Sequence, residues 1–310
     1  MRTDLVRRVI SGPTMGTRYS AVFFAPIALD LSVLPAALEA VVDTVDRQMS
    51  TWKPESDLMR LNRAAVGRWV DLPYEVATVL AAALEIGRLS DGAFDIGVGD
   101  LVTAWGFGAA AGTTDRRAIA APGAAQRLPA HLALELDEAG QRVRKHAQVT
   151  LDLSAIAKGY GVDELARVLE RFGVTSYLVS IDGELRAGQG KPDGSAWRVA
   201  LESPEFGHRR AAGVIEIADV ALATSGDYRH FVERDGVRFG HTMDPRRRIR
   251  LGHGPASVTV RAATAMQADA WATALMVLGP ERGSEVASAQ GLDVLFAERE
   301  ADARSLTSTA

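Results

Sequence analysis

Apolar residues recur every three or four positions in four stretches of the chain. These stretches are residues 34–49, 76–90, 156–172 and 266–278. Side chains at this spacing lie on one face of a helix, so each stretch predicts a helix with one face buried in a core. The last helix is expected to end at Gly279-Pro280, because proline cannot continue a helix.

Shorter stretches of alternating or β-branched apolar residues predict strands. They lie at residues 18–24, 175–181, 185–187, 197–201, 214–217, 221–224, 256–261 and 292–296. Several of them are joined by tight turns such as Asp182-Gly183-Glu184, and they do not alternate regularly with the helices. This order predicts an α+β fold in which helices pack on mixed or antiparallel sheets.

The stretch at residues 151–173 joins a strand-like start to one of the predicted helices. Apolar and polar residues alternate from Val149 to Leu153, which is typical of a strand end. Ser154 is a residue type that caps the N-terminus of a helix, and Gly173 is the type that follows its C-terminus. A strand end, a capped helix start and a helix stop are therefore expected in close succession.

Two glycines and a lysine occupy the first turns of this helix. Gly159 and Gly161 each cost about 1 kcal/mol relative to alanine in a helix. Lys158 precedes them near the helix N-terminus, where free N–H groups and the helix dipole favour an anion. The residues alone are compatible with a phosphate site, and equally with a surface lysine beside glycines that allow tight helix packing.

At 310 residues the chain could hold one large domain or two of ordinary size, and we expect a single domain over residues 12–298. The glycine-rich stretch at residues 91–108 is expected to form a loop that approaches a ligand closely. Residues 109–129 read as a surface excursion, and they mark a weak boundary if the domain has two lobes. The ends at residues 1–11 and 299–310 are expected to be flexible.

Composition narrows the function class. Apolar residues make up 47% of the chain, and the net charge is -4, so nothing indicates a nucleic-acid-binding surface. Cysteine is absent, which excludes disulfides and thiol chemistry. No stretch reaches the length of about 20 apolar residues that a membrane helix needs, and no export signal or lipid-anchor cysteine is visible. We therefore expect a cytoplasmic location.

Asp269 and Thr273 are four residues apart on a predicted helix, so their side chains share one face. A carboxylate and a hydroxyl are hard oxygen ligands that suit Mg²⁺, which keeps several waters and binds substrate phosphates. For an isolated pair, an aspartate on a solvated face and a threonine bonded to its own helix is the more common arrangement.

Two loop residues also have chemical potential. Trp52 follows a predicted helix, where an aromatic ring either packs over the core or stacks on a flat ligand, and the residues alone favour the core. His241 precedes Asp244 in a loop, where a histidine acts as a general base or is simply a polar surface residue. The glycine-rich stretches match neither a Walker A motif nor a dinucleotide fingerprint.

Taken together, the motifs resemble those of the ApbE-like FAD:protein FMN transferases. The resemblance runs from Gly12 to Gly279, and the pieces occur in the order found in that family. They read GPTMGTRY, STW with a following RLN, GAFDIGVGDLVTAWGFG, LDLSAIAKGYGVD, SIDGELRA, TSGDYRHF, GHTMDP, and SVTV followed by ADAWATALMVLG.

The resemblance implies a site for FAD, as substrate, and for Mg²⁺. It implies that the metal is held by the side chains of Asp269 and Thr273 and by a backbone oxygen at Ala155. It further implies that FAD lies against a set of residues spread along the chain, with Thr242 near the phosphates. The other members of this set are Met15, Trp52, Ala93, Phe94, Asp95, Asp152 and Lys158.

The reaction implied by the resemblance is flavinylation of an acceptor flavoprotein. A threonine or serine hydroxyl attacks the FMN-side phosphorus of FAD, AMP leaves, and FMN stays attached through a phosphoester. His241 or Asp227 would accept the hydroxyl proton, and we favour His241. Two alternatives remain: a Mg²⁺-dependent FAD pyrophosphatase that gives FMN and AMP, and an FAD-binding protein without transfer activity.

The chain departs from the family pattern at two places. It has Asp182-Gly183-Glu184 where the family commonly has a Gly-Gly-Asp turn. It has Arg246-Arg247-Arg248 where the family usually has a small Thr-Gly turn. These arginines are expected to alter the choice of acceptor or to hold a different anion.

Overall fold

The computed structural model describes residues 4–108, 127–203, 211–226, 231–234, 237–240, 242–251, 254–298 and 307–309. Its main sheet has the strand order β1-β2-β6-β7-β10-β15-β16-β17, and every neighbouring pair is antiparallel. The strands are β1 (Leu5–Thr14), β2 (Thr17–Pro26), β6 (Tyr177–Ile181), β7 (Glu184–Ala187), β10 (Val220–Gly226), β15 (Ser257–Ala262), β16 (Asp293–Ala297) and β17 (Thr307–Thr309).

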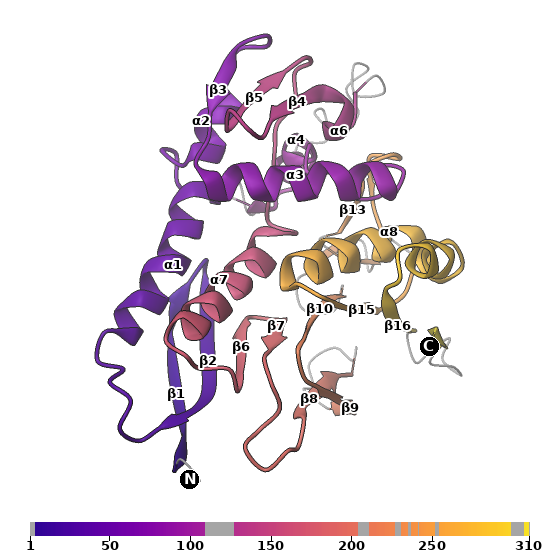
Figure 1. Cartoon of the computed structure of the whole chain (residues 1–310). Coiled ribbons are helices and arrows are strands. Elements are labelled where there is room, and N and C mark those ends of the chain that lie inside the picture. Colours follow the sequence, from indigo (N-terminus) through magenta and orange to yellow (C-terminus); the bar gives the residue numbers. More distant parts are fainter. Residues whose placement is uncertain are drawn as a thin grey trace.

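Three helices cover one face of this sheet (Figure 1). α7 (Ala157–Arg171) packs on β6 and β7, α8 (Ala265–Ala289) packs on β10 and β15, and α1 (Leu34–Met49) packs on α7. α3 (Tyr74–Leu89) contacts both α1 and α8 from the side away from the sheet. The α+β prediction is confirmed, with an antiparallel main sheet.

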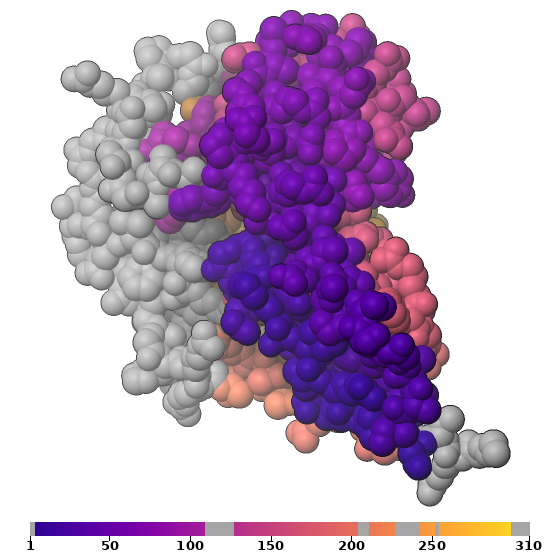
Figure 2. All heavy atoms as spheres, turned by 90° about the vertical axis from the view of Figure 1, so that its left-hand side faces the viewer, coloured from indigo at the N-terminus to yellow at the C-terminus, as the bar shows by residue number. Residues whose placement is uncertain are grey.

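The remaining elements are short. α2 (Asp57–Arg63), α4 (Gly99–Ala104), α6 (Ala130–Ala133) and a small sheet of β3 (Trp69–Asp71), β5 (Arg142–Lys145) and β4 (Leu134–Asp137) lie beyond α3. In the space-filling view of Figure 2, the indigo atoms of β1 and β2 lie below the purple atoms of the segment that contains α2 and α3. Three hairpins complete the fold: β8 (Trp197–Glu202) with β9 (Ala211–Ile217), β11 (Phe231–Arg234) with β12 (Val237–Gly240), and β13 (Met243–Asp244) with β14 (Ile249–Arg250).

Alternation along the strands gives the main sheet two apolar faces. Tyr177, Val179 and Ile181 of β6 are buried against the helices. Leu178 faces the other way and packs in a small cluster with Trp197 of the β8–β9 hairpin. Successive side chains of a strand point to opposite faces, so the helices cover one side of the sheet and this hairpin covers part of the other.

Two interactions fix the crossing of α7 and α8. At Gly159 an added Cβ would lie 2.3 Å from the carbonyl oxygen of Ala265, so only glycine allows the helices to come this close. Asp163 of α7 accepts the backbone N–H groups of Ala265 and Met266, each at 3.0 Å, and caps the N-terminus of α8. Tight packing is thus one function of the glycines near the start of α7.

Asn62 of α2 holds the chain that leads into α7. Its amide oxygen accepts the N–H of Leu151 at 2.7 Å, and its amide nitrogen donates to the Leu151 carbonyl at 2.9 Å. These two hydrogen bonds take the place of a neighbouring strand. Residues 151–153 belong to no strand, which corrects the expected strand end.

The structure corrects three further expectations. α7 begins at Ala157 with Ile156 as its N-cap, and Ser154 instead donates its N–H to Asp152. The stretch at residues 91–108 contains the helix α4, and residues 5–11 belong to β1 rather than to a flexible end. Gly173 follows α7 with φ +74°, as predicted.

The predicted end of the helix at Gly279-Pro280 is confirmed as a break within α8. Gly279 has φ 74° and ψ 174°, so the α8 backbone breaks there, and a second helical part starts with Pro280. The proposed boundary near residues 109–129 falls mostly outside the described residues. Around it, one cluster of buried apolar residues extends from the small sheet through α3 to α8 and β15.

The α7–α8 contact generates a stability prediction. Replacing Gly159 by alanine is expected to lower the free energy of unfolding by about 1–3 kcal/mol, because the new methyl group overpacks a backbone contact. The matched control is Gly213→Ala, where an added Cβ meets no atom within 4 Å. Urea unfolding of both variants measures the effect. A Gly159→Ala protein at least as stable as the wild type, as helix propensity alone would give, would contradict this account.

Candidate functional site

A cavity of about 740 Å³ lies between the main sheet and the β8–β9 hairpin and reaches the starts of α7 and α8. Alternation on the sheet decides which residues face it. Leu222 and Thr224 of β10 line the cavity, whereas Ala221 and Ala223, which alternate with them along the strand, are buried on the helix face. The cavity therefore lies on the sheet face that the helices leave uncovered, and it passes β10 to reach α8.

Five of the residues singled out from the sequence line this cavity together. They are Met15, Ala155, Lys158, Asp269 and Thr273. Met15 lies in the β1–β2 turn with φ 45°. Ala155 and Lys158 come from the start of α7, and Asp269 and Thr273 come from α8. Three segments far apart in the sequence thus meet at one end of the cavity.

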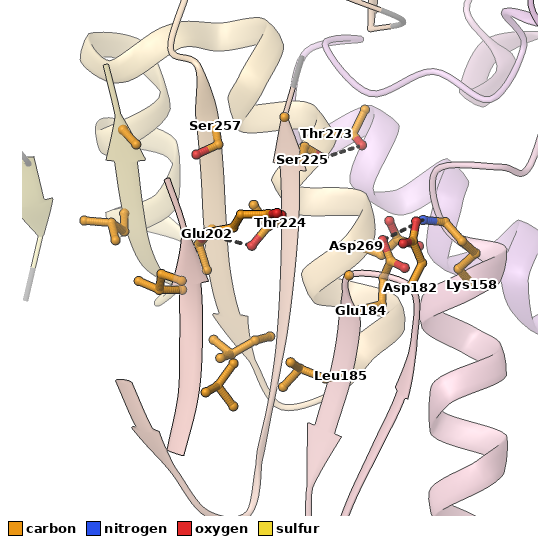
Figure 3. Close-up of a pocket in the computed structure, with 18 of the residues that line it drawn as sticks. Lys158, Asp182, Glu184, Leu185, Glu202, Thr224, Ser225, Ser257, Asp269 and Thr273 are labelled. Carbon is orange, nitrogen blue, oxygen red and sulfur yellow. Dashed lines mark hydrogen bonds and ion pairs between the residues drawn. The ribbon is translucent and has the colours of Figure 1, made fainter. Parts of the chain in front are cut away.

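Carboxylates surround the ammonium group of Lys158 (Figure 3). The Nζ atom donates to Oε1 of Glu184 at 2.8 Å and lies 3.7 Å from Oδ2 of Asp182. Burial alone would lower the pKa of Lys158, but the charges of Glu184, Asp269 and Asp182 outweigh it and raise that pKa. Lys158 is therefore a fixed positive charge at the wall of the cavity.

Asp269 is buried, and its Oδ2 atom accepts the backbone N–H of Gly159 at 3.0 Å. Burial, and next the charge of Glu184, raise the pKa of Asp269 to about 8. Burial also raises the pKa of Glu184 above its ordinary value, against the effect of Lys158. This end of the cavity thus places three acidic side chains, Asp182, Glu184 and Asp269, around the single positive charge of Lys158.

The donor set fits a hard cation. Oγ1 of Thr273 lies 3.2 Å from Oγ of Ser225, next to the Asp269 carboxylate one helical turn away. Oε2 of Glu184 is buried without a hydrogen-bond partner in the described part of the chain. Among the described residues, no group of three acidic or histidine side chains is close enough together to hold a metal ion by itself. A cation here would therefore need substrate oxygens as further ligands.

A second group of predicted residues lies next to this end, outside the cavity lining. Asp152 donates its N–H to the carbonyl of Ile96 at 2.7 Å, which joins the segment before α7 to residues 93–96. Ala93 and Phe94 are buried in the core. The carboxylate of Asp95 accepts the N–H groups of Gly97 and Ala130. The contact of these residues with a flavin stays a prediction.

Trp52 does not line the cavity. Its side chain is 63% exposed, so the interpretation that favoured core packing is wrong. The loop is shaped by Ser56, which donates to the Ser50 carbonyl and caps α2 through the N–H of Met59. This arrangement leaves the indole at the surface, and a stacking role toward a ligand stays a prediction.

Thr242 is buried just before the β13–β14 hairpin and accepts the N–H of Leu251. His241 and Asp227, the two residues predicted to accept a proton, lie outside the described residues. In the sequence, Asp227 follows Gly226, which lines the cavity, and His241 precedes Thr242.

The arginines that depart from the family pattern contact acidic residues of the same chain. Arg246 and Arg247 lie 3.4 and 3.8 Å from the buried carboxylate of Asp244, and Arg248 lies 3.7 Å from Asp100. They hold the hairpin together and attach it to α4. The expectation that they hold a separate anion finds no support in these contacts.

Sequence reasoning missed the role of Glu184 and Asp182, which it treated only as a variant turn. One signal was available in the sequence. A lysine in a binding pocket needs a negatively charged partner, and the turn Asp182-Gly183-Glu184, which follows a predicted strand, supplies two carboxyl groups. Nothing local to either segment shows that they meet.

No helix in the described part of the chain is both long and apolar enough to cross a membrane.

The chain is 38% identical over 298 residues to the FAD:protein FMN transferase of Klebsiella pneumoniae, covering 95% of this chain and 85% of that protein. It is equally similar to the FAD:protein FMN transferase of Vibrio cholerae, at 38% over 298 residues, covering 93% and 86%.

Solved structures give the same result. The flavin transferase ApbE of Vibrio cholerae superposes with a TM-score of 0.88 at 34% identity, covering 99% of this chain and 98% of that one. The apo form of the Pseudomonas stutzeri flavinyl transferase ApbE superposes with a TM-score of 0.87 at 37% identity, covering 98% and 95%. The sequence profile of the ApbE family matches residues 15–296. With its sequence and its fold in agreement, this chain belongs to the ApbE family.

Proposed function

We propose that this protein transfers the FMN part of FAD to a threonine or serine hydroxyl of an acceptor flavoprotein, with Mg²⁺, and releases AMP. One observation carries the proposal. In a chain of the ApbE family, the cavity brings Lys158, Asp269, Thr273 and Ala155 to one point. A cation, two hard oxygen ligands and a backbone carbonyl are the groups that a pyrophosphate requires.

The metal would be held by the side chains of Asp269 and Thr273 and by the carbonyl of Ala155. When bound, Mg²⁺ would neutralise charge on the phosphates of FAD. The excess of negative charge around Lys158 supports this assignment, because a buried carboxylate with a raised pKa is stabilised by a nearby cation.

The protein's own residues would carry out the rest of the reaction. Lys158 is held by Glu184 at 2.8 Å, so its charge is in place before substrate binds. The acceptor oxygen forms a bond to the FMN-side phosphorus while the bond from that phosphorus to the bridging oxygen of AMP breaks. The hydroxyl proton passes to His241 or Asp227, of which we favour His241.

Product analysis tests the proposal. We expect protein, FAD and Mg²⁺ to give AMP in step with flavin bound to an acceptor domain, and Asp269→Asn to lower the rate by about a hundredfold or more. The control is Asp293→Asn, an exposed residue on β16. AMP with free FMN would instead identify an FAD pyrophosphatase. Bound FAD without AMP would identify an FAD-binding protein without transfer activity.

The role of Asp269 can also be tested without activity. In EDTA we expect Asp269→Asn to melt at or above the temperature of the wild type, because the amide keeps an acceptor for Gly159 and removes a buried charge. Mg²⁺ at 100 times its dissociation constant should stabilise the wild type by about 2.7 kcal/mol and leave the variant unchanged. Equal stabilisation of both proteins would exclude Asp269 as a ligand.

A further inference from the structure

The cavity is larger than the end that holds Lys158 and Asp269. Its other part lies between the β8–β9 hairpin and strands β10, β15 and β16, where Glu202, Thr224 and Ser257 lie across β10 from the group around Lys158 (Figure 3). Residues 93–95, Asp152 and Thr242, which the family resemblance assigns to the flavin, do not line it. In Figure 1 the neighbouring elements α4 and β13 lie on the opposite side of α8 from this hairpin.

The walls of this second part suit a polypeptide better than a planar ring. No aromatic side chain lines the cavity among the described residues, so a ring would find no stacking partner. Small residues line it on both sides, including Ala200, Ala212 and Gly213 on the hairpin and Ala297 on β16. Small side chains allow a second backbone to approach closely.

At the Lys158 end of the cavity, the sheet presents a free edge on the β7 side of β10. β10 pairs with β15 over Ala221–Gly226 but with β7 only over Val220–Leu222. In the described part of the chain, residues 223–226 therefore have no strand partner on the β7 side. An extended peptide can add to such an edge through main-chain hydrogen bonds. Ser225 of this edge is hydrogen-bonded to Thr273, so a peptide bound there would lie next to the proposed metal site.

The charge of the cavity limits what can enter it. Its described lining contains five carboxylates, on Asp182, Glu184, Glu202, Asp269 and Glu298, and one cationic side chain, on Lys158. A neutral or basic segment would be attracted or tolerated there, and an acidic one would be repelled.

We propose that the part of the cavity under the β8–β9 hairpin receives the acceptor polypeptide, as an extended, neutral or basic segment that runs along β10 and carries the reacting hydroxyl. The inference rests on the proposed transferase function. In-line transfer requires the nucleophile and the leaving AMP to lie on opposite sides of the phosphorus. The acceptor enters from the hairpin side, and FAD binds from the side of α4 and β13. The hairpin therefore determines which acceptors are modified.

The absence of cysteine from the wild-type chain allows a clean test. Gly213→Cys places one thiol in the cavity, where an added Cβ meets no atom within 4 Å. Val214→Cys is the matched control, because Val214 is the next residue along β9, is exposed, and does not line the cavity. Each protein is folded first and then labelled with fluorescein maleimide. Transfer to an apo acceptor domain and FAD binding are measured before and after labelling.

We expect the label at position 213 to lower kcat/KM for the acceptor by about tenfold or more and to leave the dissociation constant of FAD within about twofold. The label at position 214 should change neither value. Bound acceptor domain should slow labelling of position 213, whereas FAD with Mg²⁺ should not. Ala212→Cys, also in the cavity lining, serves if the first variant folds poorly.

Two results would overturn the inference. Undiminished transfer by the labelled position 213 would show that the acceptor binds elsewhere. Loss of FAD binding on labelling, or protection of the thiol by FAD, would assign this space to the nucleotide. Failure of the unlabelled protein to modify any acceptor would count against the proposed function itself and is visible before any label is added.

Discussion

The contact between α7 and α8 at Gly159 is the constraint on which the site depends. Only a residue without a side chain lets the carbonyl of Ala265 come so close, and the same closeness lets the Gly159 N–H bind the carboxylate of Asp269. The glycine that packs the helices therefore also orients the proposed metal ligand. The two readings of this segment, tight packing and a phosphate site, are compatible, because the packing creates the geometry that a phosphate-binding cation would need.

This arrangement concentrates charge in a place where charge is costly. Asp269 and Glu184 are both buried, and Lys158 compensates only part of their charge, so burial raises the pKa of each carboxyl. Such a cluster lowers stability unless a further cation is present. Proteins accept local costs of this kind where function requires them. The clustering of unfavourable charge in one cavity, against an otherwise apolar core, is the physical reason for placing the proposed reaction at this end of the cavity.

Much of the architecture followed from residue patterns, because burial on one face imposes a period that can be read locally. The helices at residues 34–49 and 266–278, the break at Gly279 and the antiparallel strands were predictable for this reason. Pairings between distant segments were not. The bond from Lys158 to Glu184 depends on the register of β6 with β7, and the exposure of Trp52 depends on how Ser56 closes its loop. The motifs identified which residues matter, and the fold decided which of them meet.

The two departures from the family pattern have different consequences once their contacts are known. Glu184 lies at the proposed reactive end, where its carboxylate accepts a hydrogen bond from Lys158, so this departure changes the surroundings of the lysine. The arginines contact Asp244 and Asp100, and Arg250 of the same hairpin lies over the rings of Trp105 and Phe107 at 4.9 and 4.5 Å. Interactions of this kind attach the β13–β14 hairpin to the end of α4. The Arg247 side chain nevertheless stays 76% exposed, so an effect of these arginines on the choice of acceptor stays a prediction beside the one proposed for the β8–β9 hairpin.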